Sequence, residues 1–287
     1  MLPAMTCSEP NRSRCLRPPA LVLLFAALLA GCAHRVAPRP VPPERVAALL
    51  AAAEGEWERW GRLDVRVPAG GEFCAELPGD RCMTVDDGCG KEQDALLCPV
   101  VNTYWDAVNH AEPDAPRHWC TQAMHCEAQW PAEWGAPDDT PPWSAAFISA
   151  LMRQAGFDAT EFAFSDTHAI YLVAARDGKT SAYAVVPTPA TAEPGDLVCA
   201  TRQAHSGDAQ PTRLAQIRAT GAATPMHCDL VVAVDAAANR LDAIGGNVQQ
   251  SVARSRIALD EQGRVNGALN PSRPWIAVMR LRKAATP

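Results

Sequence analysis

The sequence predicts an α+β protein in which helices come first and a sheet follows. Helical patterns with apolar residues three or four positions apart lie before residue 187, whereas the later part contains short β-branched or alternating runs separated by Gly, Asn or Pro. The chain has 287 residues, 48% of them hydrophobic, which suffices for the core of one or two domains. This order favours an antiparallel sheet packed on one or more helices.

The N-terminus has the order of an export signal. Several arginines within residues 12–17 precede the apolar run Ala20–Ala30, which is about half the roughly 20 residues needed to cross a bilayer. The sequence LAGC at residues 29–32 resembles the lipobox at which bacterial lipoprotein signals are cut before a lipid-modified cysteine. We therefore expect residues 1–31 to form a lipoprotein signal peptide and Cys32 to carry the lipid. The alternative is an ordinary signal peptide followed by a cysteine by chance.

A lipid at Cys32 would hold the protein on a membrane facing the periplasm, because two or more acyl chains give stable anchoring. Residues 32–43 are rich in proline without a core pattern, which predicts a tether ahead of a single domain at 44–283. Ala33 and His34, rather than an acidic residue, follow Cys32, which favours the outer membrane.

Charge and cysteine content narrow the functional class. The net charge of −6 and the lack of a basic stripe argue against a nucleic-acid partner. Eleven cysteines are typical of an oxidising compartment, and eight of them follow the lipobox. Connectivity does not follow from sequence alone. Two pairs are plausible disulfides, one closing a tight loop and one joining two neighbouring strands: Cys120 with Cys126, and Cys199 with Cys228.

A zinc site is the competing interpretation of one cysteine cluster, which contains His118, Cys120, His125 and Cys126. No CxxC motif occurs there, and the spacing matches no standard metal template. We therefore expect no metal and no cofactor.

The first half of the chain predicts helices on either side of an irregular region. Apolar residues spaced along Pro43–Gly61 indicate an amphipathic helix. Residues 62–140 are rich in Gly, Pro, Cys and Trp and predict a disulfide-held irregular region, with one short helix over Val100–His110. Most of the tryptophans are expected to pack in the core or in loops, although they could also stack on sugar rings.

The next segment predicts two helices that carry polar residues at their starts. Thr140 could cap a helix that opens with Pro141 and Pro142 and ends at Gly156, with Ser144 in its first turn. A second, short helix is expected after Ser165 or Asp166, carrying His168 and Tyr171. The strands are then expected at Asp196–Ala200, Asp229–Val234, Leu241–Ile244, Ser251–Leu259 and Trp275–Leu281.

Several stretches of this chain resemble a known family. PWSAAFISALMRQAGF, EPGDLVCATR, MHCDLVVAV and AIGGNVQQSV, together with GEWERWG and NTYWDAV, are similar to the bacterial domain of unknown function 2272 over about residues 45–282. That family in turn resembles the papain-like superfamily of NlpC-type and CHAP-type amidases and peptidases, which cleave peptide or amide bonds in peptidoglycan. The resemblance implies a papain-like fold with helices packed on an antiparallel sheet.

The resemblance also implies a set of site residues. Ser144 matches the nucleophile that opens a helix, His227 matches the general-base histidine at the start of a strand, and Asn247 matches the polar residue that orients it. Active members of the superfamily have cysteine where this chain has Ser144. A serine hydroxyl is much less acidic than a thiol and must lose its proton during attack.

Other residues are candidates for the surrounding cleft. His168 and Tyr171 fit the pattern of the nearer family, and a second imidazole near Ser144 could bind substrate or act as the base. Asp229 shares a face with His227 because side chains alternate along a strand, and Trp143 precedes Ser144. Arg202 is a candidate anion contact at the end of a strand, whereas Asp196 is expected to be a turn residue.

Two functions of different classes stay open. In the first, the protein is an envelope amidase or peptidase that acts on peptidoglycan with Ser144, His227 and Asn247. In the second, it is a catalytically silent module that binds peptidoglycan or an envelope peptide. Hydrogen bonding of Ser144 to His227 or to His168, in a cleft open to solvent, separates the two.

Overall fold

The computed structural model describes residues 35–70, 74–77, 81–83, 96–108, 142–202, 213–220, 223–271 and 273–285, of which 74–77 and 81–83 are described by their backbone alone. The α-helices in these ranges are α2 (Pro43–Arg59), α3 (Cys98–Trp105), α5 (Ser144–Gln154) and α6 (His168–Arg176). The predicted leader and Cys32 lie outside the described residues. The helices expected near residues 43–61, 100–110, 141–156 and 166 onwards are all present.

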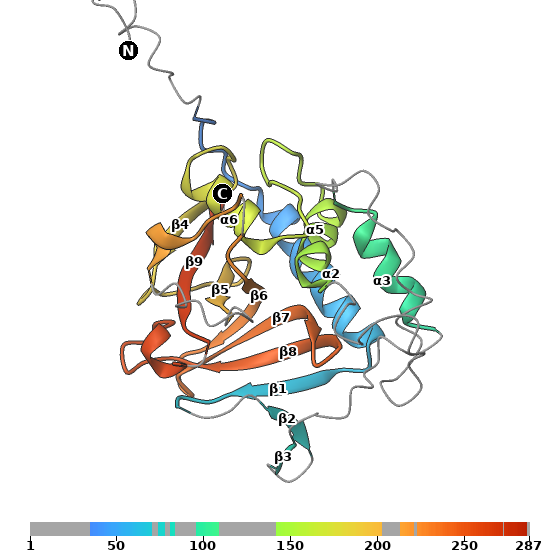
Figure 1. Ribbon diagram of the computed structural model, residues 1–287, viewed down its shortest axis with the longest axis vertical. Coiled ribbons are helices and arrows are strands. Elements are labelled where there is room, and N and C mark those ends of the chain that lie inside the picture. Colours follow the sequence, from blue (N-terminus) through green and yellow to red (C-terminus); the bar gives the residue numbers. More distant parts are fainter. Residues whose placement is uncertain are drawn as a thin grey trace, which may run out of the picture. The chain divides into compact units, whose positions relative to one another are not determined.

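The described strands form one sheet in the order β3, β2, β1, β8, β7, β6, β5, β9, β4. Their bounds are β1 Leu63–Val67, β2 Cys74–Leu77, β3 Arg81–Met83, β4 Tyr183–Pro187, β5 Leu197–Thr201, β6 Met226–Asp235, β7 Arg240–Val248, β8 Ser251–Ala258 and β9 Trp275–Leu281. The protein is therefore α+β, as the sequence predicts. Figure 1 shows the strands turning from nearly horizontal at β1 and β8 to nearly vertical at β9.

The prediction of an antiparallel sheet is wrong in one place, because the sheet is mixed. β1 pairs in parallel with β8, and Val65 lies opposite Ser255. The simple meander is also interrupted, since β9 pairs with β5 and β4 instead of following β8. These pairings join segments far apart in the sequence, so local alternation carries no information about them.

The prediction of an irregular region over residues 62–140 is wrong where that region is described. It contains the strands β1, β2 and β3, which were not predicted, besides the predicted short helix, α3. β1 is held by a neighbour distant in sequence: Asp64 accepts hydrogen bonds from Arg254 and Arg256 on β8, at 2.9 and 2.8 Å.

The end of the predicted tether contacts the domain. Val41 is fully buried, and its N–H donates to Arg282 O at 2.6 Å.

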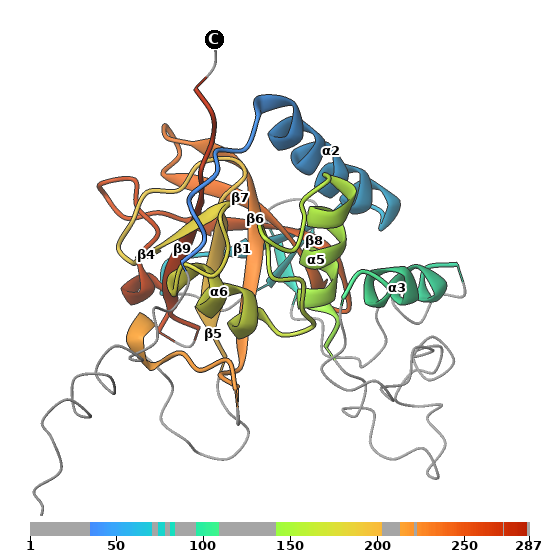
Figure 2. The same cartoon turned by 90° about the horizontal axis from the view of Figure 1, so that it is seen from above.

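The two faces of the sheet pack against different partners. One face contributes Cys228, Leu230 and Ile244 to a core shared with the four helices. In Figures 1 and 2, α2, α5 and α3 lie together on this side of the strands. The other face forms a second cluster among the strands themselves, which includes Val231 and Trp275. β5 is buried at every position, with Leu197 and Cys199 in the first cluster and Val198 and Ala200 in the second.

Helix α5 begins one residue after Trp143, whereas the sequence predicted a start at Pro141. The Trp143 carbonyl accepts from Phe147 N, and the Trp143 ring stacks on Trp60 with centroids 5.2 Å apart. The helix ends as predicted at Gly156, whose positive φ of 77° allows a Schellman motif with Phe157 N donating to Met152 O. Both ends of the helix that carries Ser144 are thus fixed by packing or by capping.

Candidate functional site

Ser144 is the first residue of α5 and is only 3% exposed. The first N–H groups of any α-helix have no acceptor within the helix, and they mark its positive end. The helix packs on β6 and β7, which lie in the middle of the sheet. Ser144 therefore has the local environment that suits a nucleophile or an anion contact.

The hydroxyl of Ser144 is hydrogen-bonded to His168. Ser144 Oγ lies 2.7 Å from His168 Nε2, and the other ring nitrogen, Nδ1, is in a short contact with Tyr171 OH. His168 and Tyr171 lie one turn apart on α6, so the same helix positions the imidazole and the group behind it. When His168 carries its proton on Nδ1, that N–H donates to Tyr171 and Nε2 accepts from Ser144.

Burial keeps this cluster neutral. Desolvation, with smaller contributions from His227 and Arg202, holds the pKa of His168 well below 6.5. Desolvation also raises the pKa of Tyr171 well above 10, so its phenol stays protonated. His168 is therefore a neutral imidazole at physiological pH and can accept a proton.

Ser144 and His168 line one pocket. The loop before α6 and the chain entering β6 complete it, with Asp166, Thr167, Thr224, Met226 and the guanidinium-bearing Arg202 among its lining residues. The side chains that form the Ser144–His168 hydrogen bond thus border a space that a ligand could enter.

His227 belongs to a second network. Its Nε2 lies 2.6 Å from Asp229 Oδ1, and its Nδ1 lies 3.1 Å from an Arg202 nitrogen. A guanidinium can only donate, so Nδ1 accepts and the proton is on Nε2, which donates to Asp229. Desolvation lowers the pKa of His227, which is consistent with a neutral ring. Both ring nitrogens of His227 are therefore engaged, and neither bond involves Ser144.

The two histidines nevertheless touch each other. Their ring centroids are 5.3 Å apart in an edge-to-face arrangement. Arg202 lines the pockets on both sides of this contact. The two networks therefore form one continuous polar cluster.

Two adjacent glycines on β7 make room for this cluster. A Cβ added to Gly245 would lie 1.8 Å from Asp229 Oδ1, and one added to Gly246 would lie 2.5 Å from Phe147 Cβ on α5. Because side chains alternate across a strand, Gly245 allows the His227–Asp229 pair on one face and Gly246 allows α5 to approach the other. The GG pair in the sequence is thus a packing requirement of both networks.

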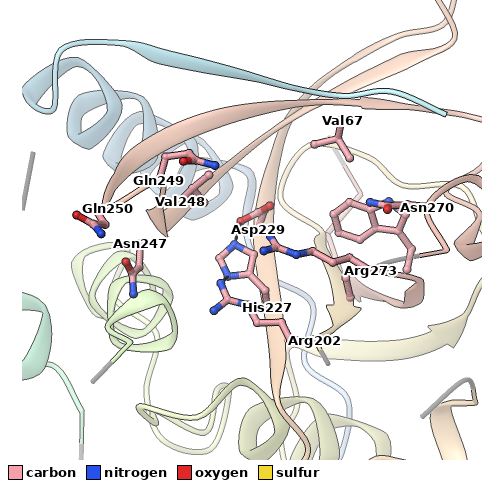
Figure 3. Close-up of a pocket in the computed structure, with 12 residues that line it drawn as sticks. Val67, Arg202, His227, Asp229, Asn247, Val248, Gln249, Gln250, Asn270 and Arg273 are labelled. Atoms are coloured by element: carbon pink, nitrogen blue, oxygen red, sulfur yellow. Dashed lines mark hydrogen bonds and ion pairs between the residues drawn. The ribbon is translucent and has the colours of Figure 1, made fainter. Parts of the chain in front are cut away.

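Figure 3 shows a second pocket beside His227 and Asp229, with carboxamide side chains on one side and Arg273 on the other. Asn247, Gln249 and Gln250 come from the end of β7 and its turn into β8. Asn247 lies here, in the same pocket as His227, and its φ is 55°. No hydrogen bond between Asn247 and His227 is among those of the described residues.

The structure brings most of the predicted site residues together. Ser144, His168 and Tyr171 form one network, and His227 with Asp229 forms the other. Trp143 is 1% exposed and stacks in the core, and the described lining of the two pockets does not include it. Every described tryptophan is buried, as expected; Trp119, Trp130 and Trp134 lie outside the described residues.

The cysteine predictions have different outcomes. Cys199 on β5 and Cys228 on β6 form a disulfide between directly paired strands, which confirms that prediction. Cys120 and Cys126, with the competing zinc ligands His118 and His125, lie outside the described residues. Within the described ranges, no three His, Cys, Asp or Glu side chains are grouped so as to hold a metal ion.

Sequence reasoning missed part of the second pocket. Arg273 and the Gln249-Gln250 turn were not singled out, and Arg202 was noted only as an anion contact. The available signal was Gln-Gln at the tip of a hairpin, where Asn-Gly or Asp-Gly is the usual pair. Arg273 gave no comparable signal. It lies in the pocket because the strand that follows it, β9, pairs with β5, and this pairing of distant segments has no local sequence pattern.

None of the described helices is both long enough and apolar enough to span a membrane. Comparison with curated proteins and with solved structures found no match. The family model described as "uncharacterized protein conserved in bacteria (DUF2272)" matches residues 92–281, which include α5, α6 and every residue of the two networks. The match spans well over half of the chain, and the protein therefore belongs to this bacterial family of domains of unknown function.

Proposed function

We propose that the protein is a serine-dependent hydrolase of amide or peptide bonds, in which Ser144 is the nucleophile and His168 the general base. The observation that carries this proposal is the 2.7 Å hydrogen bond between Ser144 Oγ and His168 Nε2 at the edge of a pocket. A nucleophile and a base within hydrogen-bond reach, with a third group behind the base, are the usual elements of nucleophilic catalysis. Tyr171 is that third group.

In the proposed reaction, Ser144 Oγ attacks the substrate carbonyl carbon while its proton passes to His168 Nε2. The carbonyl oxygen becomes an oxyanion, which N–H groups at the start of α5 can stabilise. The C–N bond then breaks and the leaving amine takes the proton from His168. Water, deprotonated by His168, hydrolyses the acyl-serine and restores the hydroxyl.

The low pKa of His168 acts on this reaction in two ways. It keeps the imidazole unprotonated across the physiological range, which a base requires. It also disfavours the buried imidazolium that forms during attack, so the developing oxyanion must compensate for that positive charge. We therefore expect slow turnover unless the bound substrate also stabilises the positive charge on His168.

The substrate class is proposed from the resemblance to NlpC-type and CHAP-type proteins. The features that support a papain-like assignment are a helix with Ser144 at its start and its packing on the antiparallel strands β6 and β7. The sequence resemblance matches His227 and Asn247 to that superfamily's base and orienting residue, but Ser144 is bonded to His168. We thus assign the base to His168 and a binding role to His227.

The proposed location follows from the leader. A lipid on Cys32 would place the domain in the periplasm, on the outer membrane, within reach of peptidoglycan. Cys32→Ala should move the protein from the membrane fraction to the soluble periplasmic fraction. Retention of that variant in the membrane fraction would contradict lipid anchoring at Cys32.

A second candidate is a silent module that binds peptidoglycan or an envelope peptide. The observation that favours it is burial: Ser144 is 3% and His168 5% exposed, which leaves little surface for a scissile bond. Under this alternative, binding would survive loss of the Ser144 hydroxyl, and no bond would be cleaved.

The test measures release of soluble muropeptides from purified peptidoglycan by the full-length chain extracted in detergent. Ser144→Ala should abolish release. Ser255→Ala is the matched control, because Ser255 is buried on β8 and its Oγ has no partner among the described atoms. Release only by Ser144→Cys would indicate a preserved but silent site. Binding to peptidoglycan without release by any variant would favour the module.

A further inference from the structure

The second pocket is lined by two guanidinium groups and one carboxylate. Arg202 and Arg273 enter it beside Asp229, as Figure 3 shows. His227 is neutral, because its Nδ1 accepts from Arg202 and its Nε2 donates to Asp229. Among the described lining residues, the formal charge is therefore one positive unit, which matches a monoanion such as a carboxylate.

The charge of Arg273, which is exposed, acts on the more deeply buried guanidinium of Arg202. Desolvation, and next the charge of Arg273, lower the pKa of Arg202 to about 10. An anion bound between them would relieve this repulsion. A guanidinium also offers a planar fork of donors that fits a carboxylate in a bidentate manner.

Two buried polar atoms of the pocket residues have no hydrogen-bond partner within the described part of the chain. One is a donor, Arg202 Nε, and the other is an acceptor, Gln250 Oε1. An unsatisfied buried polar atom costs about 1 to 3 kcal/mol, and a ligand that supplies the partner removes this cost. A ligand that presents both an acceptor and a donor could satisfy the two atoms.

The hairpin that carries Gln250 is strained in a way that favours a binding role. Gln249 and Gln250 form the two-residue turn between Val248 and Ser251, with φ values of 51° and 52°. Such turns favour Asn and Gly, because a larger side chain with positive φ costs about 1 kcal/mol or more. Two glutamines here keep the strain and place carboxamides at the rim of the pocket.

We propose that this pocket binds the C-terminal carboxylate of a peptide. Arg202 and Arg273 hold the carboxylate, and the carboxamide oxygen of Gln250 accepts the peptide N–H next to it. This inference is independent of the proposed reaction, since the pocket can bind a peptide end whether or not Ser144 is reactive. Arg202 also lines the pocket of Ser144, so the two pockets adjoin each other at this residue.

The experiment is calorimetric titration of the full-length, detergent-extracted protein with N-acetyl-alanyl-alanine and with its C-terminal amide. The two probes differ only in the carboxylate. The acid should bind at least tenfold more tightly, because hydrogen bonds to a charged group contribute more than neutral ones. Equal binding of acid and amide, or binding of neither at millimolar concentration, would overturn the proposal. Because binding alone is measured, failure of hydrolysis does not affect this result.

Variants locate the binding on the protein. Arg273→Gln should weaken binding of the acid about tenfold. Arg280→Gln is the control and should leave binding unchanged, because Arg280 is an exposed residue of β9 that bonds to Thr191 instead. Gln250→Gly should weaken binding while raising the melting temperature, because glycine relieves the positive φ. A Gln250→Gly variant that is more stable and binds as well as the wild type would overturn the role of Gln250.

Two further probes test the ligand class. Glucuronate carries a carboxylate on a sugar, and inorganic phosphate carries more charge. Both should bind more weakly than the peptide acid. Tighter binding of either one would overturn the assignment to a peptide C-terminus.

Discussion

The two histidine networks use the same residue type under different electrostatic conditions. His168 is bonded to two neutral hydroxyl groups, Ser144 and Tyr171, whereas His227 lies between a cation and an anion, Arg202 and Asp229. The charged neighbours fix the tautomer of His227 and occupy both of its nitrogens. The neutral neighbours leave His168 able to exchange a proton with Ser144. The comparison indicates that the first network suits proton transfer and the second suits binding.

Substitution of each histidine in turn distinguishes the two networks directly. His168→Gln should lower the rate of muropeptide release about a thousandfold or more, because no base then remains for Ser144. His227→Gln should lower it about tenfold or less, through substrate binding. Initial rates with both variants check this, and circular dichroism confirms their folding. A greater loss with His227→Gln would reverse the assignment of the base.

The paired glycines allow each network to be disturbed separately. Gly245→Ala would collide with Asp229, and Gly246→Ala with Phe147, each costing about 1 to 3 kcal/mol of unfolding free energy. We expect Gly245→Ala mainly to weaken binding of the peptide acid, and Gly246→Ala mainly to lower the rate of muropeptide release.

Gly55→Ala is the matched control for both glycine variants. Gly55 lies in α2 with nothing within 4 Å of an added Cβ, and alanine there should stabilise the protein by about 0.5 to 1 kcal/mol. Identical effects of Gly245→Ala and Gly246→Ala on binding and turnover would show that the two networks do not act separately.

Acid should destabilise the fold through both histidines. Their pKa values are lowered from 6.5, mainly by desolvation, so between the lowered pKa and pH 6.5 the unfolded chain binds more protons than the folded one. Stability therefore falls as pH decreases below about 6.5, by at most about 1.4 kcal/mol per pH unit for each histidine.

Urea midpoints between pH 7.5 and 5 measure this slope. His168→Gln should flatten the curve, because it removes one of the two contributions. A midpoint that rises on acidification, or a slope unchanged in that variant, would show that His168 is not buried as a neutral group.

A milder change is expected on substitution of Tyr171. Tyr171→Phe keeps the ring but removes the oxygen behind His168, so the rate of release should fall about tenfold with a smaller change in KM. The pH dependence of the rate should also shift, because the imidazole loses its partner. An unchanged rate and pH profile would reduce Tyr171 to a packing residue.

Local patterns predicted the elements that carry the site. The apolar spacing and the terminal glycine of α5 indicated a helix with Ser144 in its first turn, and period-two alternation placed His227 and Asp229 on the same face of a strand. The apolar runs around Cys199 and Cys228 indicated neighbouring strands, which the disulfide confirms. These features depend on residues within a few positions of one another, and so the sequence is enough to find them.

Local patterns in the sequence indicate the α+β class, the helix that presents Ser144 and the polar residues available to it. Which histidine reaches the hydroxyl depends on tertiary packing: His168 is 24 positions from Ser144, and the packing of α6 against the sheet brings the two together. Tertiary packing also decided the parallel insertion of β1 and the meeting of Arg202 with Arg273. Contacts between distant segments depend on how whole elements pack, and no local periodicity encodes that packing.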